Sequence, residues 1–154
     1  MYENSFFSKE KNLGKRGFSL REKNPPYILG VVMKTVFVFG NPLVKEDSIA
    51  LKTARELGKK IKGIEFREIR ALSDLEKIPE TLEIIDCAEG IEKITVLEDL
   101  KMIEAEKKVS MHDFDLGTEL LLMKKIGKIK KVKLVLIPKE YGLEKAVQET
   151  RAIF

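Results

Sequence analysis

The sequence predicts an α/β fold in which a mostly parallel, twisted sheet is sandwiched between helices in a single domain. Two apolar runs rich in β-branched residues, at 34–40 and 131–138, are typical of strands buried on both faces. Segments with helical spacing of apolar residues alternate with such runs, which is the pattern of a parallel sheet covered by helices. A length of 154 residues with 44% hydrophobic residues suits one domain with its own core.

The first strand and helix are expected just after Met33. The run "KTVFVFG" at 34–40 is continuously apolar after its first two residues, as expected of a central strand. The segment 47–62 then predicts a helix, because Ala50, Ala54, Leu57 and Ile61 fall on one face.

Four further strands follow from the same reasoning. "IEFREI" at 64–69 alternates apolar and charged residues, which favours an edge strand or a strand with one wet face. "TLEIIDCAEG" at 81–90 predicts a strand ending near Asp86, "EKITVLEDL" at 92–100 another, and "KVKLVLIP" at 131–138 a buried one.

Two more helices complete the expected domain. One is predicted at 115–126 and is stopped by Gly127. The other is predicted at 141–152, where Leu143, Ala146, Val147 and Thr150 form an apolar stripe.

The N-terminal segment differs from the rest of the chain. Residues 1–26 show neither helical nor strand periodicity and end in Pro-Pro, so we expect 1–32 to be a flexible extension and 33–154 to be the domain. Natural translation starting at Met33 is an alternative, because "MKTVFVFG" begins a compact domain at once. A secretory signal is not indicated, since no apolar core follows the basic residues.

Charge and cysteine content exclude several classes of protein. Residues 1–33 hold six basic and three acidic residues, which leaves 23 basic and 22 acidic residues in the nearly neutral remainder. Binding to nucleic acid is therefore not indicated. No apolar run is long enough to span a bilayer, so no membrane association is expected. The single cysteine, Cys87, suits a reducing cytoplasm, which is the expected location.

Candidate functional residues follow the strand ends. In parallel sheets, ligands bind outside the carboxyl ends of the strands. That rule selects "GNPLVKED" with Asp47, "DCAEG" with Asp86, and the segment "SMHDFD" with His112, the only histidine. The first loop lacks a glycine-rich phosphate-binding pattern, so no nucleotide or other organic cofactor is expected.

Each of these residues also has a purely structural interpretation. Asp47 precedes a predicted helix and is suited to cap it, Asp86 is suited to start a turn, and His112 to hydrogen-bond backbone in a loop. Cys87 fits a small core residue better than a nucleophile, although a Cys87–His112 dyad stays open. One imidazole and two carboxylates suit a divalent metal such as zinc or nickel, but the spacing does not support a permanent zinc site.

Taken together, the segments resemble the hydrogenase maturation endopeptidases. "VFVFGNPLVKED" looks like that family's first strand and acidic loop, and "IIDCAEGI" like its central strand ending in aspartate. "SMHDFDLGTELL" resembles its histidine segment, and "LVLIPKEYGLEKAVQE" its last strand and closing helix. The likeness runs in order from about residue 34 to the end of the chain.

The resemblance implies a fold and an activity. Members of the family have a phosphorylase/hydrolase-like α/β fold and remove a C-terminal peptide from the nickel–iron hydrogenase large-subunit precursor after nickel insertion. Carried over to this sequence, the metal-contacting and catalytic residues are Asp47, Asp86 and His112. The nickel is expected to arrive with the protein substrate, and the enzyme is expected to be a peptidase of the aspartyl type.

Two features depart from the family, and one other function stays open. Ser48 stands where the family usually has glycine, and "EIRALSD" replaces its Asp-Gly at the end of the second strand. The alternative is a non-catalytic receiver-like regulatory domain, suggested by strand-end aspartates and by Lys139 after the last strand. A receiver has its acidic pair directly after the first strand, whereas Asp47 comes seven residues after Gly40.

Overall fold

The computed structural model describes residues 27–28, 31–44, 48–99, 101–102 and 114–154. Its main feature is a five-stranded sheet with the strand order β4-β3-β5-β7-β6. In chain order these strands are β3 (Lys34–Phe39), β4 (Ile64–Ile69), β5 (Thr81–Ala88), β6 (Thr95–Leu97) and β7 (Lys131–Pro138).

The sheet is parallel except at one edge. Strands β4, β3, β5 and β7 pair in parallel, and only β6 is antiparallel to its neighbour β7. The mostly parallel sheet and the edge position of 64–69 are thus confirmed. The strand predicted at 92–100 is shorter than expected, because only Thr95–Leu97 pair with β7.

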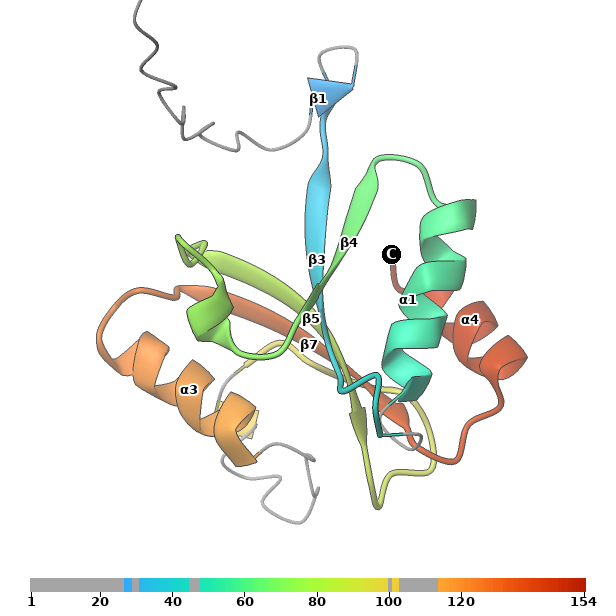
Figure 1. Ribbon diagram of the computed structural model, residues 1–154. Helices are drawn as coiled ribbons and strands as arrows, with labels where there is room; N and C mark the ends of the chain where they lie inside the picture. The colour runs from blue at the N-terminus through green and yellow to red at the C-terminus, as the bar shows by residue number, and fades with distance from the viewer. Residues whose placement is uncertain (1–26, 29–30, 45–47, 100, 103–113) are drawn as a thin grey trace, which may run out of the picture.

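Helices cover both faces of this sheet. Helices α1 (Ser48–Lys60) and α4 (Leu143–Arg151) pack against each other on one face, and α3 (Phe114–Lys125) covers the other (Figure 1). Each predicted helix is present, with its ends shifted by one or two residues. Gly127 follows α3 with φ of +75°, a conformation that a residue with a Cβ rarely adopts, so the predicted stop is confirmed.

Alternation along the strands divides the core into two layers. On β5, Leu82, Ile84 and Ala88 point to the layer that includes Leu120 of α3. Ile85 and Cys87 point to the opposite layer, under α1 and α4. The prediction that Cys87 is a small core residue is confirmed, since it is 1% exposed.

Two residues of the predicted apolar helix faces are not buried. Leu143 is 39% exposed because it is the first residue of α4, beyond the part of the helix that packs on the sheet. Ile61 is only half-buried because α1 ends at Lys60, after which the chain turns at Gly63, with φ of +84°, into β4.

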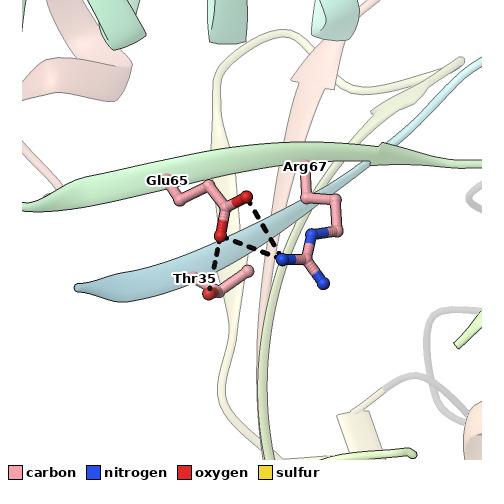
Figure 2. A network of polar contacts seen from close by, with 3 residues as sticks. All are labelled: Thr35, Glu65 and Arg67. Carbon is pink, nitrogen blue, oxygen red and sulfur yellow. Dashed lines mark hydrogen bonds and ion pairs between the residues drawn. The ribbon is translucent and has the colours of Figure 1, made fainter. Parts of the chain in front are cut away.

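Polar side chains occupy part of the sheet face near the β4 edge. The Thr35 hydroxyl donates to Glu65 (3.4 Å), whose carboxylate also accepts two hydrogen bonds from Arg67 at 3.1 and 3.2 Å (Figure 2). These residues share a face of the sheet with Phe37 and Ile69, and α3 covers the β5 and β7 part of that same face (Figure 1). Charged residues on an edge strand also discourage pairing with another chain.

Small elements complete the described chain. Strands β1 (Tyr27–Ile28) and β2 (Val31–Val32) form an antiparallel ribbon within the predicted extension 1–32, whose residues 1–26 lie outside the described residues. A short 3-10 helix, η1 (Leu72–Asp74), connects β4 to β5. In the part of the chain that is described, no helix has the length and apolarity needed to cross a membrane.

Candidate functional site

The topology singles out the carboxyl ends of β3 and β5. From β3 the chain crosses through α1 to β4 on one side, and it later returns to β5 on the other side of β3. Because the connections leave these two neighbouring strands in opposite directions, a crevice is expected between their ends. This is the standard ligand-binding position of an open α/β sheet.

Asp86 lies at this position. It is the sixth of eight residues in β5, its backbone is in register with Leu136 of β7, and it is 4% exposed. Its Oδ1 accepts the backbone N–H of Cys87 at 2.8 Å. Since β5 continues to Ala88, Asp86 does not start a turn. A buried carboxylate is costly unless hydrogen bonds or a cation compensate its charge, which makes Asp86 a candidate for cation recognition.

The two other predicted site residues, Asp47 and His112, lie outside the described residues. The structure therefore does not test whether they meet Asp86, and the same holds for a Cys87–His112 dyad and for Asp47 as a cap. Within the described ranges, no cluster of three or more His, Cys, Asp or Glu side chains could hold a metal ion.

The described part of the "GNPLVKED" loop is a tight turn. The side-chain Oδ1 of Asn41 accepts the N–H of Leu43 at 3.0 Å, and its backbone carbonyl accepts the N–H of Val44, also at 3.0 Å. This Asx turn fixes the chain directly after β3. It leaves Leu43 89% exposed at the edge where Asp86 lies.

A cavity opens beside this turn. Its volume is about 440 Å³, and it is lined by Gly40, Pro42, Glu68, Ile69, Arg70 and Asp74, from the carboxyl ends of β3 and β4 and from η1. Polar pockets of this size fall within the ~300–1,000 Å³ range of ligand sites in proteins.

The two acids of the cavity already have hydrogen-bond donors. Glu68 accepts a two-pronged contact from Arg55, with distances of 2.7 and 3.1 Å. Asp74 Oδ2 accepts the backbone N–H groups of Arg70 and Ala71 at 2.9 and 3.0 Å. These two backbone hydrogen bonds hold the pKa of Asp74 below its ordinary value of 3.8.

A buried lysine lies at the end of β7. The Lys139 side chain is 5% exposed, and its Nζ contacts the half-exposed carboxylate of Glu89 at 2.9 Å. The backbone N–H of Lys139 also donates to the carbonyl of Ala88, at the end of β5. This ion pair therefore lies at the carboxyl edge of the sheet, next to the end of β5.

Sequence reasoning missed the cavity and the role of Lys139 in this pair. The strand-end rule was applied to the first and third strands, although "EIRALSD" also places charged residues directly after a strand. That signal would have found Arg70 and Asp74. The Lys139–Glu89 pair could not be found, because the two residues are fifty positions apart.

Comparison with known proteins gives structural matches alone. No protein-family model and no curated protein sequence matches the chain. Among solved structures, the NiFe hydrogenase maturation protease HybD from Thermococcus kodakarensis superimposes with a TM-score of 0.55 and 20% identity, over 79% of this chain and 99% of that one.

Two further structures agree with this match. The NiFe hydrogenase maturation protease HycI from T. kodakarensis KOD1 gives a TM-score of 0.55 at 19% identity, covering 79% of this chain and 90% of that one. The hydrogenase maturating endopeptidase HybD from E. coli gives 0.52 at 18% identity, covering 79% and 91%. This chain has the fold of the hydrogenase maturation proteases. The predicted fold class is confirmed, and the resemblance of the sequence segments agrees with the likeness in three dimensions.

Proposed function

We propose that this protein is an endopeptidase that removes a C-terminal peptide from a nickel-loaded hydrogenase large-subunit precursor. The observation that carries the proposal is the position of Asp86, a buried carboxylate at the topological switch point of a fold shared with three proteases of that name. The order of the resembling segments along the chain supports it independently.

Asp47, Asp86 and His112 are the proposed nickel-recognising residues. Helix α1 begins at Ser48, one residue after Asp47, and follows β3, so its first turn belongs to the carboxyl edge of the sheet. Helix α3 begins at Phe114, two residues after His112, and leads back to the start of β7. This connectivity supports a common site with Asp86.

In this mechanism nickel is part of the substrate. Two carboxylates and a neutral imidazole form a ligand set for a divalent ion, so they bind the precursor tightly only when nickel is in place. The proteolytic step is hydrolysis: water adds its hydroxyl to the amide carbonyl carbon, the C–N bond breaks, and the leaving nitrogen takes the proton. One of the carboxylates acts as the general base, or the nickel polarises the water.

Other features of the proposal follow from the sequence. We propose a cytoplasmic location, in agreement with the single buried cysteine. The receiver-like alternative is not favoured, because a receiver has its acidic pair directly after the first strand, whereas Asp47 comes seven residues after Gly40.

The test is cleavage of a purified large-subunit precursor, followed by intact-mass spectrometry. The nickel-loaded precursor should lose a C-terminal peptide and the nickel-free precursor should not. Asp47→Asn and His112→Ala should abolish cleavage. Asp99→Asn is the matched control, since this exposed aspartate follows β6 at the opposite edge of the sheet. A nickel-loaded precursor that stays intact contradicts the proposal.

A further inference from the structure

The cavity between the turn after β3 and the end of β4 contains one cationic side chain, that of Arg70. Within the described residues, the Arg70 guanidinium makes no hydrogen bond or ion pair, although it lies near enough to attract the Asp74 carboxylate at longer range. A guanidinium has five N–H donors in a planar fork that fits a carboxylate with two parallel hydrogen bonds.

The two acids of the cavity already have hydrogen-bond donors. Arg55 forms a two-pronged contact with Glu68, and two backbone N–H groups occupy an oxygen of Asp74. A basic ligand would have to compete with these donors. An acidic ligand would instead meet the fork of Arg70.

We propose that this cavity binds a carboxylate of the protein substrate through Arg70, close to the bond that is cleaved. The inference rests on the proposed function and adds a specificity determinant to it. The carboxylate comes either from an Asp or Glu side chain or from the C-terminus of the precursor, which share this chemistry.

The sheet fixes how far this carboxylate lies from the cleaved bond. Arg70 follows β4 and Asp86 lies near the end of β5, with β3 between them. Neighbouring strands are ~4.8 Å apart, so the two positions are separated by about 10 Å. An extended peptide advances ~3.3 Å per residue, which places the carboxylate about three to four residues from the bond.

The rim of the cavity offers an apolar contact to the same peptide. Leu43 is 89% exposed and is held outward by the Asn41 turn, next to Pro42 of the cavity lining. A single exposed leucine is common on protein surfaces and does not identify a site. Beside a cavity and an unpaired guanidinium, it favours a peptide over a small ion as the occupant.

The first experiment measures binding without cleavage. Blocked seven-residue alanine peptides that contain one Asp, one Asn or one Lys are titrated into the ¹⁵N-labelled protein, and the amide shifts of residues 68–74 are followed. An alanine peptide with a blocked N-terminus and a free C-terminal carboxylate distinguishes recognition of a C-terminus from recognition of an acidic side chain. We expect one of the two carboxylate peptides to bind about tenfold more tightly than the Asn peptide, as expected of a charge-assisted bidentate contact.

Variants assign this preference to Arg70. Arg70→Ala should remove the difference between the carboxylate and Asn peptides, and Arg70→Lys should retain part of it. Arg67→Ala is the matched control, because this arginine lies three residues away on β4 and is already bound to Glu65 (Figure 2). The amide spectrum of each variant shows at once whether it is folded.

The second experiment uses the precursor. Arg70→Ala should raise KM about tenfold with kcat unchanged, and Arg67→Ala should change neither. A precursor that stays uncut contradicts the proposed function, whereas a cut precursor with an unchanged KM in Arg70→Ala overturns the inference alone. Equal binding of the carboxylate and Asn peptides, or tighter binding of the Lys peptide, overturns it as well.

Discussion

Replacing Asp86 separates the catalytic role that we propose for it from its structural role. Asp86 is 4% exposed and its Oδ1 accepts the Cys87 N–H at 2.8 Å. Asparagine has nearly the same shape and keeps an oxygen for this N–H, but it carries no charge. Alanine removes the acceptor and leaves the N–H of Cys87 buried without it.

The expected magnitudes follow from these contacts. Losing the acceptor of a buried donor costs about 1–3 kcal/mol, so Asp86→Ala should lower the free energy of unfolding by that amount. Asp86→Asn should change it by less than about 1 kcal/mol, because the lost charge no longer needs compensation in a buried position. For a domain of this size, 1 kcal/mol corresponds to a Tm change of roughly 3–5 °C.

Two assays on the same preparations check these values. Urea unfolding followed by circular dichroism gives the stability, and mass spectrometry of the nickel-loaded precursor gives the cleavage. Both variants should fail to cleave, although Asp86→Asn stays nearly as stable as the original chain. Cleavage by Asp86→Asn at the original rate would contradict the proposed role of the charge, and unfolding of Asp86→Asn as readily as Asp86→Ala would contradict the role of the hydrogen bond.

Three further predictions concern stability. The pKa of Asp74 in the folded protein lies below its ordinary value of 3.8. Its contribution to the free energy of unfolding should therefore be complete above pH ~4 and be lost as the pH falls through the lower, folded-state pKa. Thermal melts at acidic pH should show this loss in the original chain and not in Asp74→Asn. Glu89→Ala should lower the free energy of unfolding by about 1–3 kcal/mol, because it removes the carboxylate that contacts the buried Lys139 ammonium. Lys139→Met should lower it by less, and equal effects of the two variants in urea unfolding would contradict this prediction. Gly127→Ala should lower the free energy of unfolding by about 1–2 kcal/mol, since φ of Gly127 is +75° and backbone strain, not a neighbour near the added Cβ, opposes the substitution. Gly127→Asn should lower it by less. A thermal melt in which Gly127→Ala has no effect would show that the turn relaxes.

Much of the fold could be predicted because local signals and tertiary packing agree. The uninterrupted apolar runs of β3 and β7 need two covered faces, and the structure covers both. Gly127 ends α3 because few other residues adopt its backbone conformation. The extent of β6 was not predictable in this way, since only Thr95–Leu97 pair with β7, although β7 itself runs from Lys131 to Pro138 and the apolar pattern around β6 is longer.

The candidate site was predictable in part. A strand-end rule located Asp86, whose burial follows from its place on a central strand between β3 and β7. The cavity depends on how η1 folds back to bring the Asp74 carboxylate to the backbone of Arg70. Such a contact depends on loop geometry, for which hydrophobic periodicity carries no information.

Anomalous diffraction at the nickel edge can show whether Asp47, Asp86 and His112 meet at one nickel ion, as we propose. In this experiment, nickel soaked into the crystals at millimolar concentration replaces the ion that the precursor carries. We expect one anomalous peak about 2 Å from a carboxylate oxygen of each aspartate and from an imidazole nitrogen of His112. A peak elsewhere, or a structure in which His112 lies far from Asp86, would contradict this proposal.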